Sequence, residues 1–263
     1  MESIDVKPFN CELKNTKQFA ELLDLLDSVS EDDSVTVSIT SDGISCKQIA
    51  QDKTRFCDVL LSSSAFTQSD CPSPLGISIN CKMLSKWIRA TAIENESLLI
   101  HADNKTFDLR KTNGYSRELS TKVGAIIRKP AKANLPEFPV HFKMNAEKLS
   151  GLIKELEIIK EVISISATKD GLALSSASER GSAKIALAWT LQPDLSLEGE
   201  VKSDVKSSYD PDMFTQVMKV IFPLCPQIEL LFGNNLPLLI KGSGEYLTVQ
   251  YVLAAKVATA TPV

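Results

Sequence analysis

The sequence contains two related copies of one segment. Residues 35–43 read Val-Thr-Val-Ser-Ile-Thr-Ser-Asp-Gly, and residues 163–171 read Ile-Ser-Ile-Ser-Ala-Thr-Lys-Asp-Gly. Asp42-Gly43 and Asp170-Gly171 lie nearly half of the 263-residue chain apart. Self-similarity at this period predicts two copies of one folding unit. A duplicated unit without catalytic residues favours a symmetric protein that holds a partner over an enzyme that transforms one.

Each copy also carries two segments with the apolar spacing of a helix that buries one face. The pairs are residues 14–29 with 146–158, and residues 81–92 with 211–222. Their apolar stripes are Phe19, Leu22, Leu23 and Leu26; Leu149, Leu152, Ile153 and Leu156; Leu84, Trp87 and Ile88; and Phe214, Val217, Met218 and Ile221. We expect Asn15 and Asn145 to cap their helices and Pro223 to end the last one.

The rest of the sequence has the pattern of β-strands joined by turns. The strand-like runs are 34–40, 44–50, 55–61, 97–102, 105–111 and 114–121, then 162–168, 172–177, 183–190, 227–232, 236–241 and 246–254. Asp42-Gly43 between two such runs is a strong hairpin signal. Two helices over antiparallel strands in each copy predict an α+β fold. We expect an N-terminal lobe over 1–121, a linker over 122–139 and a C-terminal lobe over 140–263.

The predicted linker has the composition of an extended surface crossover. It holds three prolines and four basic residues against one acid, Glu137. It has too many apolar residues for a simple spacer, namely Val123, Ile126, Ile127, Leu135 and Phe138. These either anchor the linker to the sheets or line a docking groove, and both interpretations stay open.

The composition argues against catalysis and against a bound metal or cofactor. His101 and His141 belong to no nucleophile motif, and Gly242-Ser243-Gly244 closes a hairpin instead of cradling a phosphate. None of the six cysteines forms a Cys-x-x-Cys pair, which predicts reduced, partly buried thiols. We expect a soluble intracellular protein, because no signal peptide is recognisable and no apolar run approaches the roughly 20 residues of a membrane span.

Positive charge is concentrated in one predicted helix, although the net charge of −4 argues mildly against nucleic-acid binding. Residues 81–92 contain Lys82, Lys86 and Arg89 and no acid. These three side chains fall within about 60° of one another, opposite the apolar stripe. Such a stripe is either a solvated helix face or a surface that contacts phosphates without reading sequence. The other three predicted helices mix both signs.

The order strand, helix, three strands, helix, three strands, repeated around a linker, resembles the DNA sliding clamps of the proliferating cell nuclear antigen family. The most specific runs are Ala167-Thr168-Lys169-Asp170-Gly171, Ser207-Ser208-Tyr209, Phe232-Gly233-Asn234-Asn235-Leu236-Pro237-Leu238, Asn134-Leu135-Pro136-Glu137-Phe138-Pro139 and Leu253-Ala254-Ala255-Lys256-Val257. The resemblance implies that three two-lobed subunits close head-to-tail into a pseudo-sixfold ring. Helices would line a weakly basic pore, through which duplex DNA slides, and sheets would form the outer wall.

The resemblance also implies three sets of site residues. The DNA-facing residues would be Lys14, Lys17, Lys82, Lys86, Arg89, Lys148, Lys154 and Lys219. A pocket for a client peptide would use Ile49, Phe56, Leu135, Phe138, Pro237, Val252, Leu253, Ala254 and Ala255, where the family usually has proline in place of Ala255. Edge strands 114–121 and 183–190 would meet between subunits through Tyr115, Leu119, Ile185 and Leu187. Lys169 would match a turn lysine that eukaryotic members modify with ubiquitin, or is simply an exposed turn residue.

The implied partners are duplex DNA, further subunits, a clamp loader, and the DNA polymerases, ligases and nucleases of replication and repair. No cofactor, membrane contact or enzymatic activity is implied. The protein would work in the nucleus of a eukaryote, or in the cytoplasm of an archaeon or a viral host equivalent. Two alternatives stay open. One is a subunit of a heterotrimeric replication or checkpoint clamp, and the other is a duplicated β-rich ligand-binding or enzymatic protein.

Overall fold

The computed structural model describes residues 7–91, 96–113, 115–125, 131–156, 158–159, 162–178, 181–188, 195–197, 201 and 203–256. The chain divides into two compact units, which are described separately. The first holds the chain up to Gln51, then Phe56–Lys132 and Glu245–Thr248. The second holds Asp52–Arg55, Ala133–Gly244 and the chain from Val249 onward. The predicted linker is therefore shared between the two units.

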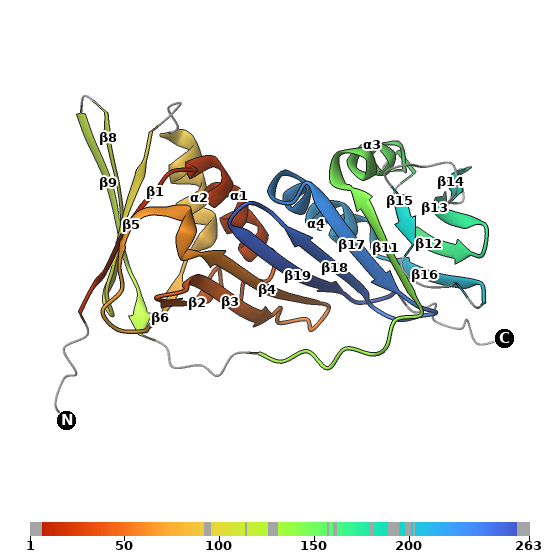
Figure 1. Ribbon diagram of the computed structural model, residues 1–263, viewed down its shortest axis with the longest axis horizontal. Coiled ribbons are helices and arrows are strands. Elements are labelled where there is room, and N and C mark those ends of the chain that lie inside the picture. Colours follow the sequence, from red (N-terminus) through yellow and green to blue (C-terminus); the bar gives the residue numbers. More distant parts are fainter. Residues whose placement is uncertain are drawn as a thin grey trace. The chain divides into compact units, whose positions relative to one another are not determined.

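In its described residues, the first unit contains strands of two antiparallel sheets and two α-helices. Figure 1 shows their arrangement. The strands are β1 (Phe9–Leu13), β2 (Val35–Thr40), β3 (Gly43–Ile49), β4 (Arg55–Ser62), β5 (Phe66–Asp70), β6 (Leu75–Ile79), β7 (Leu98–Ala102), β8 (Thr106–Asn113), β9 (Tyr115–Lys122) and β10 (Gly124–Ala125). One sheet has the order β5-β1-β7-β8-β9, and the run β10-β6-β2-β3-β4 belongs to another. Helices α1 (Thr16–Asp27) and α2 (Cys81–Ala90) pack against each other.

The second unit repeats this plan. Its strands are β11 (Val140–Asn145), β12 (Ile163–Thr168), β13 (Gly171–Ser178), β14 (Gly181–Ala188), β15 (Leu195–Leu197), β16 (Val205–Tyr209), β17 (Gln227–Phe232), β18 (Leu238–Ser243) and β19 (Leu247–Leu253). One sheet has the order β14-β13-β12-β16, and the other run is β19-β18-β17-β11-β15. Helices α3 (Ala146–Leu156) and α4 (Pro211–Leu224) pack together. The predicted α+β fold is confirmed.

The four predicted helices are present, and their ends follow the expected capping chemistry. The Asn15 side chain accepts a hydrogen bond from the Gln18 N–H at 2.9 Å, and Asn145 accepts one from the Lys148 N–H at 3.0 Å. The prediction that Pro223 ends the last helix was wrong, because α4 continues through it to Leu224. Proline removes only one backbone donor, and in the last turn this loss is tolerated.

The repeated Asp-Gly turns meet the same steric requirement in both units. Gly43 has a φ of +134°, and a Cβ there would lie 2.0 Å from the carbonyl oxygen of Leu61. A Cβ at Gly171 would lie 2.3 Å from the carbonyl oxygen of Leu187. Both hairpins therefore need a residue without a side chain where the neighbouring strand crosses closely.

Alternation along the strands separates a buried face from an open one. In the sheet β5-β1-β7-β8-β9, the buried side chains include Phe9, Leu13, Ile100, Phe107 and Leu109, each 2% exposed or less. Seven strands lie outside the predicted strand runs, namely β1, β5, β6, β10, β11, β15 and β16. In β5 only Phe66 is buried and the other four residues are exposed, so this strand lacks the apolar alternation that marks a strand in sequence.

The six cysteines are free thiols, and five of them are buried, as predicted. Burial raises the pKa of Cys11, Cys46 and Cys225 to about 12, which suppresses the nucleophilic thiolate. Among the described helices, none has the length and apolar character needed to cross a membrane.

Candidate functional site

The first unit presents a group of cations on the exposed face of its helix pair. Lys82, Lys86 and Arg89 are exposed along α2, as the sequence pattern predicts. Lys14 and Lys17, at the start of α1, are exposed as well. Burial of Leu84 and Ile88, each at most 1% exposed, fixes this orientation because it points the opposite side of α2 outward.

Acids from the neighbouring helix reach into this basic face. The Arg89 guanidinium lies 2.5 Å from the Asp24 carboxylate of α1. The Ser85 hydroxyl donates a short hydrogen bond to the other oxygen of the same carboxylate. The sequence of α2 itself contains no acid, and the acid that pairs with Arg89 comes from α1. Lys82 and Lys86 remain exposed cations beside it.

Two further carboxylates of α1 lie close to these cations. Burial raises the pKa of Asp27, an effect that the charges of Lys82 and Lys86 partly oppose. Burial likewise raises the pKa of Glu21, against the attraction of Lys17. The helix pair therefore presents a face of mixed sign, with a moderate excess of positive charge. Such a face attracts a polyanion weakly and without geometric selection.

Side chains from β8 and β9 hold the C-terminal end of α2. Lys111 Nζ donates to the carbonyl oxygens of Ile88 and Thr91, both at 3.3 Å, and Arg117 Nη1 donates to the Thr91 oxygen at 2.9 Å. Lys111 is fully buried, 3.9 Å from the buried carboxylate of Glu96. Burial lowers the pKa of Lys111, and Glu96 counteracts this shift. Cations at this position satisfy the terminal carbonyls and the helix dipole.

Sequence reasoning missed this cluster, although a signal was present. Lys111 continues the inward positions Phe107 and Leu109 of its strand, so alternation assigns it to the buried face. A lysine at such a position requires partners. Those partners are carbonyl oxygens at a helix end, which residue spacing alone does not identify.

The second unit carries fewer cations on its helices. Lys154 of α3 and Lys219 of α4 are exposed, whereas Lys148 is half-buried and donates its backbone N–H to the Asn145 cap. Glu147 and Glu155 are exposed on α3. The cations are thus concentrated on the helices of the first unit, as the sequence predicts.

Two predicted client-pocket residues belong to the first unit. Ile49 and Phe56 are paired across β3 and β4, so they share one face of the sheet. The Ile49 side chain is 37% exposed and Phe56 is 8% exposed. Nearby, the Ala131 N–H of the linker donates to the Lys47 carbonyl oxygen of β3 at 3.3 Å. The linker backbone is therefore anchored to β3 at this point.

The other predicted pocket residues belong to the second unit. Leu135 is 38% exposed, while Phe138, Pro237, Ala254 and Ala255 are half-buried. Val252 is 9% exposed and Leu253 only 1%. The Leu253 side chain is thus part of the core of the unit and can offer a client only its backbone.

Hydrogen bonds fix the C-terminal segment of the second unit. The Ala254 N–H donates to the Thr54 carbonyl oxygen, and the Lys256 N–H donates to the Ser208 carbonyl oxygen, both at 2.7 Å. This segment is therefore held in an extended course, and its side chains have defined positions before any ligand arrives.

The Ser207-Ser208-Tyr209 run and the run over 232–238 contact each other in the second unit. The hydroxyls of Ser207 and Tyr209 donate to the Leu236 carbonyl oxygen at 3.1 and 3.4 Å. The Lys206 N–H donates to the Asn234 side chain at 2.7 Å. These bonds hold the loop that presents Pro237, so this part of the predicted pocket is rigid.

The two strands that the family resemblance assigns to subunit contacts, β9 and β14, are both edge strands. Strand β9 is the last strand of β5-β1-β7-β8-β9, and β14 is the last of β14-β13-β12-β16. Leu119 is half-buried and pairs with buried Leu109. Ile185 is half-buried and Leu187 is 6% exposed. These apolar residues line the helix side of each edge, while the side chain of Tyr115 lies outside the described part of the structure.

Lys169 is exposed at the tip of the β12–β13 turn. The Asp170 N–H donates to the Thr168 hydroxyl at 3.2 Å, which fixes the turn beneath it. The lysine is thus accessible to a modifying enzyme, and its surroundings are those of an ordinary surface turn.

Comparison with known proteins identifies two family matches and several relatives. Residues 9–113 match "Proliferating cell nuclear antigen, N-terminal domain", and residues 135–257 match "Proliferating cell nuclear antigen, C-terminal domain". The "DNA polymerase sliding clamp" of Pyrococcus furiosus is 23% identical over 233 residues, covering 88% of this chain and 91% of the relative. The "Proliferating cell nuclear antigen" of Dictyostelium discoideum is 21% identical over 237 residues, covering 85% and 90%.

A solved structure shares the fold. The crystal structure of the proliferating cellular nuclear antigen from Entamoeba histolytica superposes with a TM-score of 0.82 at 17% sequence identity. The match covers 95% of this chain and 99% of that one. The fold of this chain is therefore one already known from a solved structure.

Proposed function

Because this chain belongs to the proliferating cell nuclear antigen family, we propose that it is a DNA sliding clamp, a ring of three subunits that encircles duplex DNA and holds a DNA polymerase there. The chain acts by binding, and no reaction chemistry is assigned to it. Its partners are DNA, a polymerase and further ring subunits. It works wherever the replicating DNA lies, in a nucleus or in the cytoplasm of a cell without one.

The two edge strands are the observation that carries this proposal. Strand β9 is an edge strand in the first unit and β14 is one in the second, and both carry apolar side chains on the helix side. Pairing β9 of one subunit with β14 of the next would continue both sheets and cover Leu119, Ile185 and Leu187. Two different surfaces meet in this contact, which makes it head-to-tail, and such contacts close into rings when the rotation permits.

The mixed charge of the helix faces suits a clamp that must slide. Lys14, Lys17, Lys82 and Lys86 supply phosphate contacts in the first unit, with Lys154 and Lys219 in the second. Asp24 restrains Arg89, so the number of contacts is small. Encirclement keeps the ring on DNA, and weak contacts that break easily allow movement along it.

Client enzymes would bind through a short peptide at exposed apolar residues of the second unit. Leu135 and Pro237 provide contact area. The Ala254 carbonyl and the Ala255 backbone provide hydrogen-bonding groups, since the Ala254 N–H already donates to Thr54. The fixed course of this segment lowers the ordering cost of binding. Polymerases, ligases and nucleases with such a peptide are the expected clients, and a clamp loader would open the ring.

Mass measurement and primer extension test the proposal together. The pure chain of 28.8 kDa should run as a trimer, or form a trimer when paralogous subunits are supplied. With a clamp loader it should extend the products of a polymerase on circular primed DNA. Ile185→Asp places a charge at the β14 edge and should give monomers without polymerase stimulation. Rings that form normally but leave product length unchanged would contradict the clamp function.

A further inference from the structure

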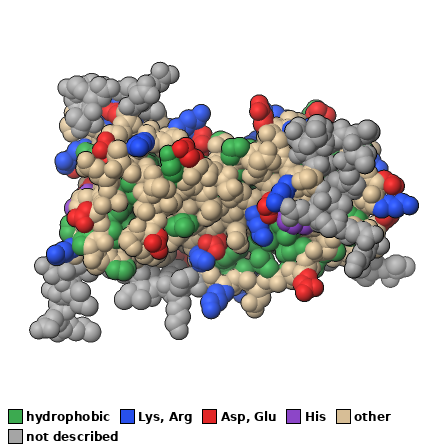
Figure 2. Space-filling model, viewed as in Figure 1, with side chains coloured by type: hydrophobic (Ala, Val, Ile, Leu, Met, Phe, Trp, Pro, Cys, Tyr) green, Lys and Arg blue, Asp and Glu red, His purple; other side chains and the backbone are tan. Residues whose placement is uncertain are grey.

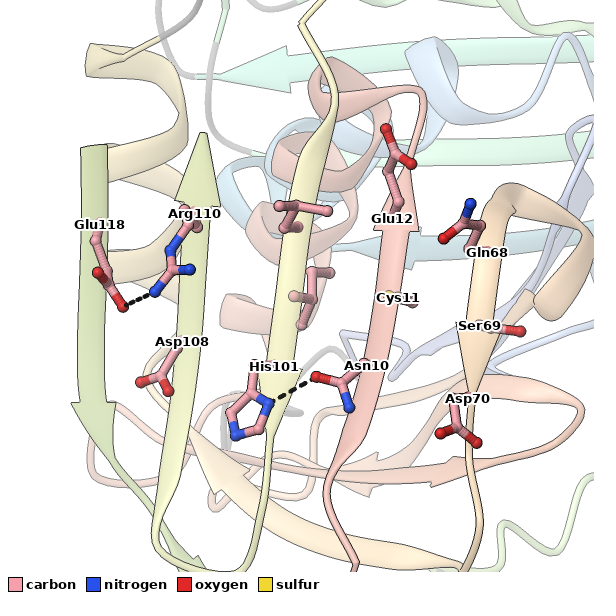
Figure 3. A pocket seen from close by; sticks show the side chains of 12 residues that line it. Asn10, Cys11, Glu12, Gln68, Ser69, Asp70, His101, Asp108, Arg110 and Glu118 are labelled. Carbon is pink, nitrogen blue, oxygen red and sulfur yellow. Dashed lines mark hydrogen bonds and ion pairs between the residues drawn. The ribbon is translucent and has the colours of Figure 1, made fainter. Parts of the chain in front are cut away.

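The open face of the sheet β5-β1-β7-β8-β9 carries two rows of polar side chains that cross its strands. Register places Gln68, Glu12, Leu99, Arg110 and Glu118 side by side in the first row. It places Asp70, Asn10, His101, Asp108 and Ser120 in the second. The side chains labelled in Figure 3 come from all five strands of the sheet. Apart from Ser120, the residues of the two rows line a groove with a volume of about 750 Å³.

Negative charge dominates this groove. Its lining holds four carboxylates, and among the residues that the structure describes, only Glu118 is paired with a cation, through Arg110 at 2.9 Å. Asp108 accepts hydrogen bonds from the hydroxyls of Ser120 and Thr106 at 2.5 and 3.3 Å, which hold it in place without neutralising it. By contrast, charges of both signs are interspersed over the face of the molecule seen in Figure 2.

The floor of the groove offers an apolar contact and a fixed ring. Leu99 is 42% exposed in the middle of the first row, although most leucines of this unit are buried. His101 Nδ1 forms a hydrogen bond of 2.7 Å with the Asn10 side chain, which orients the imidazole. An exposed leucine bordered by carboxylates is typical of a surface that binds an amphipathic segment.

We infer that this groove binds a basic, extended peptide segment of a partner protein. Carboxylates of Glu12, Asp70 and Asp108 would receive lysine or arginine side chains, and Leu99 would receive an apolar one. Asp70 and Asp108 are three strand spacings apart in one row, about 14 Å. An extended chain covers that distance in about four residues, so basic residues four positions apart fit the two carboxylates.

The chain's own ends do not fit this groove. Residues 257–263, Val-Ala-Thr-Ala-Thr-Pro-Val, contain no basic residue. Residues 1–6, Met-Glu-Ser-Ile-Asp-Val, contain two acids and no lysine or arginine. Nucleic acid is repelled by the same carboxylates. Charge complementarity therefore favours a separate protein over these occupants, and the inference does not depend on ring formation or on DNA.

Fluorescence anisotropy with the full-length protein tests the inference. The probe is a labelled peptide of about eight residues with lysines four positions apart and a leucine between them. The Glu12→Gln/Asp70→Asn variant should weaken binding by about tenfold. Leu99→Ser should weaken it by about threefold, because an exposed apolar contact is lost. A matched control, Glu155→Gln/Asp212→Asn, removes the same charge from exposed helix positions in the second unit and should change affinity less than twofold, roughly.

Three outcomes would overturn the inference. The first is equal loss of affinity in the control and groove variants, which would indicate a response to net charge alone. The second is equal binding of a peptide in which glutamates replace the lysines. The third is binding of spermine as tight as that of the peptide together with no effect of Leu99→Ser, which would make the groove a general cation site. Thermal unfolding of each variant separates loss of binding from loss of the fold.

Discussion

The Arg89 guanidinium of α2 lies 2.5 Å from the Asp24 carboxylate of α1. The two residues are 65 positions apart in the sequence, and no motif links them. Their contact changes how the basic face functions. Arg89 is 47% exposed, so solvent screens the pair and its contribution to stability is small. Its larger effect is electrostatic, because it removes one cation from those that can contact phosphate.

Asp24→Asn should therefore strengthen DNA binding. The substitution keeps an acceptor for the Ser85 hydroxyl but removes the charge that holds Arg89. One additional phosphate contact should steepen the dependence of log K on log salt by about 0.9. The measurement is binding of duplex DNA over a series of salt concentrations. Asp170→Asn, at an exposed turn of the other unit, is the control and should leave the slope unchanged.

Asp27→Asn should stabilise the protein near neutral pH. Burial raises the folded-state pKa of Asp27 above its ordinary value of 3.8, even though Lys82 and Lys86 act against the shift. The stability linked to this group is present below pH 3.8 and is lost as the pH rises through the raised folded-state pKa. The asparagine variant avoids that loss, so its advantage in melting temperature should appear at neutral pH and disappear in acid.

Asp52→Asn provides a comparison of opposite sign. At Asp52 burial raises the pKa, but hydrogen bonds from Thr54 and the charge of Arg55 outweigh it and lower the pKa below 3.8. Its stabilisation is present above the unfolded pKa and is lost as the pH falls through the folded one. This variant should therefore be less stable than the parent at neutral pH and similar to it in strong acid. Equal pH profiles for the two variants would contradict both assignments.

Gly43→Ala and Gly171→Ala should each destabilise the fold. A Cβ would lie 2.0 and 2.3 Å from backbone carbonyl oxygens, which cannot move without breaking a strand pair. We expect a loss of about 3 kcal/mol in each variant, measured by urea unfolding. Gly151→Ala is the control, because nothing lies within 4 Å of a Cβ there and the position is inside α3. It should stabilise the protein by roughly 0.5–1 kcal/mol.

Lys111→Met should destabilise the first unit by about 3 kcal/mol, because the Glu96 carboxylate would stay buried without its cation. The Ile88 and Thr91 carbonyls would also lose their donor. Adding Glu96→Gln should restore part of this loss, since the two side chains approach to 3.9 Å. Urea unfolding of the parent, the two single variants and the double variant measures the interaction energy between Lys111 and Glu96. Strictly additive losses would show that the pair does not interact.

The helices and most strands could be predicted because their signals are local. Apolar spacing located α1 to α4 to within a few residues, and asparagines identified two of their starts. Strand β5 was not predicted, because four of its five residues face solvent and its pairing with β1 is specified by tertiary contacts. Propensity and alternation cannot identify a strand that buries so little.

The candidate site was predictable in outline only. Lys82, Lys86 and Arg89 could be placed on one exposed face from helix geometry alone. That Asp24 reaches Arg89 could not, because the angle and distance between two packed helices depend on side chains throughout their interface. Leu253 is a different case, because strand alternation assigns it to the core, where the structure buries it, although the resemblance places it in a pocket.

The matched glycine turns make each molecule its own reference. Gly43 and Gly171 occupy the same place in two copies of one unit, and a leucine carbonyl oxygen crowds each of them. A change made beside one turn leaves the other untouched in the same chain and the same solution. Amide hydrogen exchange compared between the two hairpins would thus report local effects directly, with variation between samples cancelled by an internal standard.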